Sequence, residues 1–275
     1  MGLIGITGAT GAVGGRVARR LAAAGVAQRL VVRDPSRAPD LPADVRVARY
    51  GDGGALRHAF DGVDVLLLVS ASEDADRVAL HRSAVEAAAE AGVRRVVYTS
   101  FQSAAPDCTF TFGRDHAATE ELLAASRLET TVLRNSFYLN VLPEFVVDGA
   151  LRGPAGSGRV AAVARDDVAD VAVAALLDEE HSGRTYDVTG PQALTLAEVA
   201  AEIGRATGGE VTYVEETVEE AYASRASSGA PRWEVDGWVS TYTAIANGEL
   251  EAVSDVVPRL TGRPATSLRE LLARR

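Results

Sequence analysis

A glycine-rich turn close to the start of the chain constrains the fold more than any other feature. The apolar run 3–7 is followed by three glycines spaced G-x-x-G-x-x-G, and the next segment has the apolar period of one helix face. Glycines at this spacing allow a tight turn, close backbone approach to a pyrophosphate, and close packing of a helix on a strand. The helix N-terminus adds free N–H groups and the positive end of a dipole. A bare turn uses glycine too, but this position between strand and helix favours a dinucleotide site. Its candidate contacts are Gly8, Thr10, Gly11, Ala12, Val13 and Gly14.

Apolar runs and helical patterns alternate through the first 100 residues. Segment 63–69 is almost entirely aliphatic, which is typical of a strand covered on both faces of a parallel sheet. The alternation predicts an α/β fold, a Rossmann-like doubly wound parallel sheet with its ligand at the carboxyl ends of the strands. Further strands are predicted at 29–32, 45–48, 93–99, 129–134 and 184–189, and helices at 77–91, 114–126 and 166–177.

The second half of the chain is less regular. Three capping boxes, Thr195 with Glu198, Thr217 with Glu220 and Ser267 with Glu270, predict three C-terminal helices. Segment 149–158 is rich in glycine and is expected to be a loop. We predict an NAD(P)-binding Rossmann domain over 1–150 and a mixed segment over 151–275. Within the latter, 159–190 returns to the Rossmann domain and the remainder forms a smaller C-terminal substrate lobe.

Composition excludes several chemistries. All 28 basic residues are arginine, so the chain has no amine for a Schiff base, a phosphate-loop lysine or a Tyr-x-x-x-Lys pair. The net charge of −10 argues against a nucleic-acid surface. Cys108 is the single cysteine, and neither an intrachain disulfide nor a metal site is expected. With no signal peptide and no apolar stretch of about 20 residues, we expect a cytoplasmic protein outside the membrane.

The end of the second predicted strand bears on which dinucleotide is bound. An NAD-selecting fold usually places a carboxylate there, whereas this chain has Arg33, with Arg37 one turn further on. A guanidinium can hold a 2′-phosphate through paired charge-assisted hydrogen bonds. Asp34 could instead face the ribose, although Pro35 after it suggests a turn, and Arg33 could simply be solvated. We predict that NADP(H) is preferred over NAD(H).

Three other strand ends are candidates for cofactor contact. Asp52 could accept a hydrogen bond from the adenine amino group, or it could only cap the following helix. Small side chains follow the fourth strand, as needed where a ribose passes close to backbone, and hydroxyl residues end the fifth strand near the expected nicotinamide. The residues at these two ends are Ser70, Ala71, Ser72, Thr99 and Ser100.

Several segments together resemble a known group of enzymes. They are Thr7-Gly8-Ala9-Thr10-Gly11, Tyr50-Gly51-Asp52, Tyr98-Thr99-Ser100, Asp115-His116-Ala117-Ala118-Thr119-Glu120 and Leu133-Arg134-Asn135. They look like the NmrA-like class of atypical short-chain dehydrogenase/reductases. Within it the likeness is nearest to type-2 NAD(P)H:quinone oxidoreductases, with triphenylmethane reductase a near relative, and it covers nearly the whole chain.

The resemblance implies an NADPH-bound Rossmann domain, a small C-terminal lobe, and a substrate cleft between them. Where a conventional member has its catalytic Tyr and Lys, this chain has Phe112 and His116. A ketone reduced by hydride becomes a strongly basic alkoxide and needs a proton donor. A quinone becomes a stabilised hydroquinone anion, so its reduction depends mainly on positioning. We therefore expect an oxidoreductase acting on a quinone or a similar flat conjugated acceptor.

Candidate catalytic residues follow from the same alignment of motifs. His116 is expected to hydrogen-bond the nicotinamide ribose, or it is only a helix-surface residue. Asn135 is expected near the nicotinamide or the substrate, and Tyr138 is the best side-chain proton donor. The chain has only 6 Phe, 7 Tyr and 2 Trp. Several of them fall beside strand ends, where they suit a wall for a flat acceptor or serve only as core. The candidates for that wall are Phe101, Phe112, Phe137 and Tyr138.

Other functions remain open at this stage. Some NmrA-like proteins bind the dinucleotide without turnover and report the NADP/NADPH ratio by docking on a regulator, and the missing Tyr and Lys fit that role equally. An ether-reductase-like enzyme is disfavoured because the comparable members use a catalytic lysine. We expect a small-molecule aromatic or quinone substrate, no nucleic-acid partner, and a monomer or homodimer.

Overall fold

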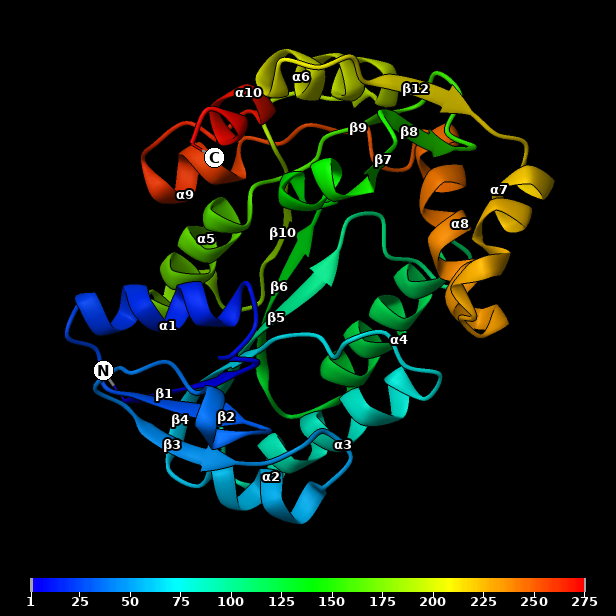
Figure 1. The fold of residues 1–275 in the computed structure, drawn as a ribbon. Coiled ribbons are helices and arrows are strands. Elements are labelled where there is room, and N and C mark those ends of the chain that lie inside the picture. The colour runs from blue at the N-terminus through cyan, green and yellow to red at the C-terminus, as the bar shows by residue number, and fades with distance from the viewer. Residues whose placement is uncertain (1, 275) are drawn as a thin grey trace. The chain divides into compact units, whose positions relative to one another are not determined.

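A seven-stranded sheet is the largest element of the computed structural model, which describes residues 2–274. Its strands are β1 Leu3–Thr7, β2 Gln28–Val32, β3 Asp44–Val47, β4 Val63–Leu68, β5 Arg95–Phe101, β6 Glu129–Asn135 and β10 Thr185–Val188. Their order is β10-β6-β5-β4-β1-β2-β3 (Figure 1). The pairs β1–β2, β1–β4, β2–β3 and β4–β5 are parallel. The chain order reverses between β1 and β4, so the predicted doubly wound α/β fold is confirmed.

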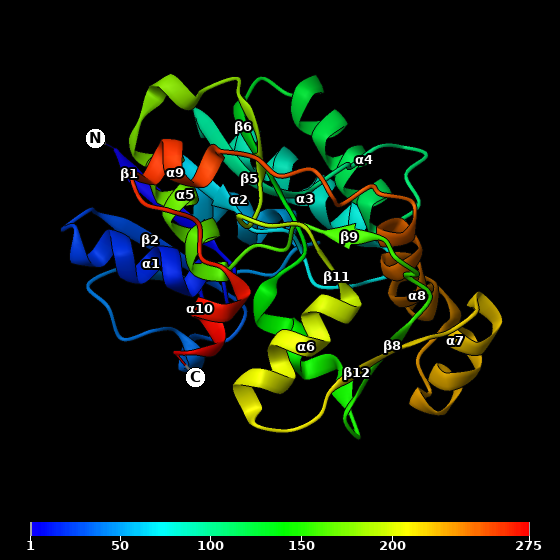
Figure 2. The same cartoon turned by 90° about the horizontal axis from the view of Figure 1, so that it is seen from above.

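Helices cover both faces of this sheet (Figures 1 and 2). One face carries α1 Gly14–Ala23 and α5 Arg165–Leu177, and the other carries α2 Gly53–Phe60, α3 Arg77–Glu90 and α4 Thr111–Ala125. An ion pair between Arg20 and Asp170 joins the first two helices. On the other face, Leu56 of α2 and Ala84 of α3 pack with Leu66 of β4 in one apolar cluster. Leu66, Leu67 and Leu68 are fully buried, as their unbroken aliphatic run predicted.

The chain divides into two compact units. The first comprises the chain up to Ser100 together with Asp115–Arg134 and Val168–Tyr186. The second comprises Phe101–Arg114, Asn135–Asp167 and the chain from Asp187 onward. The chain therefore first leaves the Rossmann unit after Ser100, at the carboxyl end of β5, well before the expected boundary at 150. The later crossings lie inside α4 and α5 and within β6 and β10, where apolar periodicity gives no sign of a boundary.

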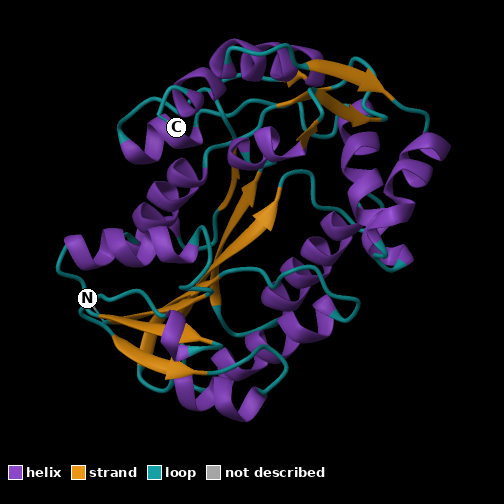
Figure 3. Ribbon diagram, viewed as in Figure 1, coloured by secondary structure: helices purple, strands orange, loops and turns teal. Residues whose placement is uncertain are grey.

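The second unit has two small sheets and a set of helices (Figure 3). Its elements are β7 Val146–Val147, β8 Ala150–Gly153, β9 Arg159–Val160, β11 Leu194–Thr195, β12 Thr212–Glu215, α6 Leu196–Thr207, α7 Val218–Arg225, α8 Arg232–Ala246, α9 Val256–Thr261 and α10 Leu268–Leu272. Short 3₁₀ helices occur in both units: η1 Pro35–Arg37 and η3 Glu179–His181 in the first, and η2 Leu139–Phe145 and η4 Ala226–Ser228 in the second. Among residues 2–274, no helix combines the length and apolarity needed to cross a membrane.

Predictions for the second unit were partly correct. All three capping boxes form, at the starts of α6, α7 and α10, and α6 ends at the left-handed Gly208. The prediction of a plain loop over 149–158 was wrong, because it contains β8. That strand pairs with β7 on one side and with β12, about 60 residues further on, on the other. A short strand with a distant partner leaves little local signal.

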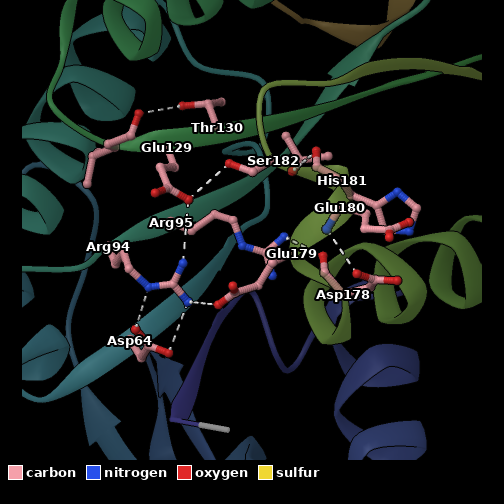
Figure 4. Close-up of polar contacts among 12 residues, drawn as sticks. Asp64, Arg94, Arg95, Glu129, Thr130, Asp178, Glu179, Glu180, His181 and Ser182 are labelled. Carbon is pink, nitrogen blue, oxygen red and sulfur yellow. Dashed lines mark hydrogen bonds and ion pairs between the residues drawn. The ribbon is translucent and has the colours of Figure 1, made fainter.

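Two consecutive arginines connect the amino ends of the strands in the first unit. Arg94 forms ion pairs with Asp64, Glu129 and Glu179, which belong to β4, β6 and η3 (Figure 4). Arg95 is only 1% exposed, and its guanidinium donates to backbone carbonyl groups at the end of α5. The two arginines therefore connect α5 and η3 to the amino ends of the strands, which lie opposite the carboxyl ends.

Candidate functional site

A pocket of about 450 Å³ lies at the carboxyl ends of strands in the first unit, beside the point where strand order reverses. Ligands of open α/β sheets bind at such a point. The lining residues are Gly8, Thr10, Gly11, Val31, Val32, Arg33, Ala48, Arg49, Tyr50, Val69, Ser70, Ala71, Ser72, Glu73, Asp74 and Leu80. The pocket thus brings together the predicted glycine turn, the predicted arginine and the predicted serine segment.

The glycine turn has the geometry that its spacing requires. Gly8 adopts φ 61°, and Gly11 N–H donates to Gly8 O at 2.8 Å. A Cβ at Gly14 would lie 2.4 Å from Gly8 O, so only glycine lets the start of α1 approach the end of β1 this closely. Ala12 and Val13 lead into α1, which begins at Gly14 with Val13 as its N-cap, and none of the three is among the lining residues. The turn therefore presents backbone to the pocket, which suits a diphosphate.

Arg33 and Arg49 both line the pocket, whereas Arg37 lies outside the lining, in the exposed η1. The Asp34 side chain binds within its own turn, since its carboxylate accepts hydrogen bonds from Ser36 N at 2.9 Å and from Ser36 Oγ at 2.7 Å. These hydrogen bonds, first of all the one from the Ser36 hydroxyl, hold the Asp34 pKa below its usual value. The turn that Pro35 suggested is therefore the observed role of Asp34.

Asp52 likewise takes the simpler of its two predicted roles. It is exposed, lies outside the lining, and caps α2 by accepting from Ala55 N at 3.0 Å. The observed role of Asp52 is therefore the helix cap, made through Oδ1, and its contact with the adenine stays a prediction.

The segment that follows β4 is fixed by side chains from other elements. Val69 N donates to Thr7 Oγ1 at 2.9 Å, and Ser70 N donates to Thr99 Oγ1 at 2.8 Å. Tyr50 Oη lies 2.6 Å from both Thr7 Oγ1 and Val69 O. Burial of the Tyr50 phenol raises its pKa, so it is neutral. Thr99 thus supports this part of the pocket through backbone, behind the lining residues.

The backbone N–H and C=O of the next residue, Ala71, are both held by α3. Its N–H donates to His81 Nε2 at 2.8 Å, and its carbonyl accepts from Arg77 Nε at 3.0 Å. Behind these two residues lies α4: His81 Nδ1 is 2.7 Å from Thr119 Oγ1, and Arg77 pairs with Asp115 at 3.7 Å. The lining segment is therefore connected to the Asp-His-x-x-Thr-Glu motif of α4.

His116 is 5% exposed and is enclosed by this cluster. Its Nε2 lies 3.1 Å from an Arg77 nitrogen, and its Nδ1 lies 2.9 Å from Tyr98 Oη. Arginine can only donate, so Nε2 accepts and Nδ1 carries the proton. Burial, followed by the Arg77 charge, holds the His116 pKa well below 6.5. A hydrogen bond from His116 to a ribose would have to replace one of these two partners.

Ser100 and Glu120 belong to a second polar cluster at the ends of β5 and β6. The Ser100 hydroxyl donates to Glu120 Oε1 at 2.5 Å, and Arg134 donates to both Glu120 oxygens, at 3.0 and 2.6 Å. A bidentate arginine–carboxylate pair fixes both side chains. It joins α4 to β6, and it connects Glu120 and Arg134, which come from two of the motifs that carry the family resemblance.

The candidates for the acceptor wall lie in the second unit, and they differ in burial. Phe101 and Phe137 are partly buried beside its core, and Tyr138 lies under the Arg165 guanidinium, 5.3 Å from the ring centroid to Cζ. Phe112 is 7% exposed and packs against Trp233 of the second unit. A Cβ at Gly237 would lie 2.3 Å from that ring. Phe112 therefore has a packing role in α4 and α8, and we withdraw it as a wall residue.

Asn135, the expected contact of the nicotinamide or the substrate, is 1% exposed at the end of β6.

A family model described as NAD(P)H-binding matches residues 8–179. The chain belongs to the NAD(P)H-binding, NmrA-like family. Quinone oxidoreductase 2 of Escherichia coli is 35% identical over 98% of this chain and 96% of its own. The crystal structure of that NADPH-dependent enzyme with NADPH has a TM-score of 0.90, at 33% identity, covering 98% of this chain and 99% of its own.

Two other relatives are similar over nearly their whole length. The NAD(P)H azoreductase of Xenophilus azovorans is 33% identical, over 96% of this chain and 95% of its own. Citrobacter sp. triphenylmethane reductase complexed with NADP(H) has a TM-score of 0.86 at 30% identity, covering 98% of this chain and 99% of its own. The resemblance stated from the motifs is thereby confirmed. Among residues 2–274, no cluster of His, Cys, Asp and Glu is arranged to hold a metal.

Sequence reasoning gave no role to several side chains that shape the pocket of this NmrA-like family member: Arg49, Tyr50, Arg77, His81 and Thr119. Tyr50 and Thr119 stood inside the motifs that carried the resemblance, without an assigned role. Arg77 and His81 are spaced i, i+4, which places them on one face of α3. This spacing of two polar side chains in an otherwise alanine-rich helix was the signal in the sequence that could have pointed to them.

The two buried histidines predict that folding stability falls as the pH drops below about 6.5. Burial, then the Arg77 charge, lowers the His81 pKa to about 3, and His116 is shifted in the same direction. The unfolded chain binds these protons near pH 6.5 while the folded chain does not. Each histidine should therefore remove about 1.4 kcal/mol of stability per pH unit between its two pKa values. Above pH 6.5 neither contributes.

Urea unfolding between about pH 5 and pH 7 measures this slope. His81→Gln should reduce it by about 1.4 kcal/mol per pH unit. The matched variant His58→Gln removes an exposed imidazole in α2 and should leave it unchanged. Equal slopes in the wild type and His81→Gln would show that His81 is not held neutral.

Proposed function

We propose that this chain is an NADPH-dependent oxidoreductase that transfers a hydride to a quinone or a similar flat, conjugated acceptor. The observation that carries the proposal is the pocket at the reversal point of the sheet, where Gly8, Gly11 and Arg33 line one cavity of about 450 Å³. The relatives support it, since they are named as a quinone oxidoreductase, an azoreductase and a triphenylmethane reductase. Their names share a cofactor class and flat, conjugated substrates.

The residues present fit the cofactor. Gly8 and Gly11 present backbone to the pocket, and Gly14 lets the start of α1 lie close behind them, because a Cβ there would collide with Gly8 O. Arg33, with Arg49 beside the same cavity, supplies the positive charge that a 2′-phosphate needs. When bound, NADPH supplies the hydride. The protein's own contribution is to bind, orient and exclude water.

The proposed acceptor class follows from what α4 carries. Phe112 and His116 stand where a conventional relative has its Tyr and Lys, and both are buried and already engaged. A ketone would leave an alkoxide without a strong proton donor at this position. A quinone, reduced to a hydroquinone anion, needs less assistance. Asn135, Phe101, Phe137 and Tyr138 are our candidates for the acceptor side, with Tyr138 as the proton donor.

Arg33→Asp should shift cofactor preference from NADPH toward NADH. The substitution removes a charge-assisted contact to the 2′-phosphate and adds a repulsive carboxylate. Together these should lower the NADPH/NADH ratio of kcat/KM by roughly 100-fold. The matched variant Arg37→Asp changes charge equally, but outside the lining, and should alter the ratio only slightly. A lowered ratio in Arg37→Asp alone would move the role to that residue.

NADPH oxidation at 340 nm with small benzoquinones and naphthoquinones tests the function directly. Turnover that depends on the quinone is the expected result. Binding affinities for NADPH and NADP⁺ should be measured on the same preparation. Tight binding without turnover across the panel would instead identify a dinucleotide sensor, and no binding would overturn the proposal altogether.

A further inference from the structure

The two peptide groups that flank Ala71 in the cofactor pocket are both held by a single helix. Ala71 belongs to the described lining, which includes neither Arg77 nor His81. Those two residues, one turn apart on α3, bind the two polar groups of its backbone: His81 Nε2 accepts from Ala71 N at 2.8 Å, and Arg77 Nε donates to Ala71 O at 3.0 Å. Between them they fix the orientation of the two peptide groups on either side of Ala71 within the pocket surface.

The proton positions behind this contact are determined by chemistry. Because His81 Nε2 accepts from an amide, its Nδ1 must carry the proton. That proton goes to Thr119 Oγ1 at 2.7 Å, and the Thr119 hydroxyl in turn donates to Asp115 O at 2.7 Å. Both His81 and Thr119 are fully buried. A chain of directed hydrogen bonds therefore runs from the backbone of α4 to the pocket lining.

We propose that Thr119 and His81 are positioning residues for the dinucleotide: Thr119 fixes the histidine tautomer, and the histidine fixes the Ala71 amide in the pocket surface. This inference rests on the proposed function, since it concerns the same NADPH pocket. It gives the threonine of the Asp-His-x-x-Thr-Glu motif an indirect role, through His81. Loss of the hydroxyl lets the imidazole exchange tautomers or rotate, and the Ala71 amide then loses its acceptor.

The test compares three variants of the full chain. Thr119→Val keeps the size of the side chain and removes the hydroxyl, and it should raise the Kd for NADPH about tenfold. Its kcat at saturating NADPH should stay within about twofold of wild type, because the role is in binding. Thr119→Ser restores the hydroxyl and should restore the Kd. Thr131→Val is the matched control, since Thr131 is fully buried in the same unit and donates to His181 O at 2.8 Å, outside the pocket.

A spectroscopic measurement separates positioning from general loss of stability. Nitrogen-15 NMR should show His81 as the Nδ1–H tautomer in the wild type and a tautomer mixture in Thr119→Val. An unchanged Kd and tautomer in that variant would overturn the inference, as would a Kd raised equally in Thr131→Val. Wild-type protein that does not bind NADPH would overturn the proposed function instead, so the two failures are distinct.

Discussion

A Gly14→Ala variant is expected to lose at least 100-fold in NADPH affinity and to unfold more easily than the wild type. The added Cβ would lie 2.4 Å from Gly8 O, 2.7 Å from Gly8 C and 2.9 Å from Thr7 O. All three are backbone atoms, so none can rotate away, and relief requires α1 to move from β1. Overpacking of this kind costs about 3 kcal/mol or more. The movement also withdraws the helix N-terminus from the diphosphate.

Fluorescence titration with NADPH and urea unfolding measure the two effects. Gly53→Ala is the matched control, because its Cβ would meet only Ser83 Oγ at 3.5 Å, an ordinary contact at the start of α2. That variant should bind NADPH like the wild type. Normal binding by Gly14→Ala would mean that close approach of helix and strand is not what the cofactor needs.

Arg95→Met is expected to lower the free energy of unfolding by about 3 to 5 kcal/mol. The Arg95 guanidinium is nearly inaccessible and donates to Ala175 O at 2.6 Å, Leu176 O at 2.9 Å and Asp178 O at 3.1 Å. Methionine fills similar space but leaves carbonyl groups at the end of α5 buried without a donor. It also removes a positive charge from the negative end of that helix.

Its neighbour provides the control. Arg94 bonds to three carboxylates, but its side chain is 38% exposed, and screened surface pairs contribute little. Arg94→Met should therefore lose only about 1 kcal/mol. Urea unfolding with an unchanged slope against urea concentration measures both variants. Losses of equal size would contradict the assignment of the larger role to the buried arginine.

The first unit was largely predictable because its signals are local. The glycine turn, the aliphatic run of β4 and the helix periods each lie within a short window, and the structure has all of them. Arg33, which follows β2, lines the pocket, and its strand-end position is likewise a local feature, whereas its contact with a 2′-phosphate stays a prediction.

What sequence reasoning missed depends on contacts between distant segments. His81 forms hydrogen bonds with the Ala71 backbone and with Thr119, and the sequence around these residues gives no sign of either contact. His116 was expected at the ribose, but its position in the sequence could not reveal Arg77 and Tyr98 on its two nitrogens. Likewise, the chain passes from one unit to the other inside continuous helices and strands, where the apolar periodicity does not change.

The segment after β4 also has a consequence for engineering. The amides of Val69, Ser70 and Ala71 are all bonded to side chains from other elements, so the backbone path there does not rely on the side chain of Ser72. A library randomised at Ser72 would change the chemistry of the pocket surface while its scaffold stays in place. This makes the position a starting point for adapting the protein to synthetic dinucleotide analogues.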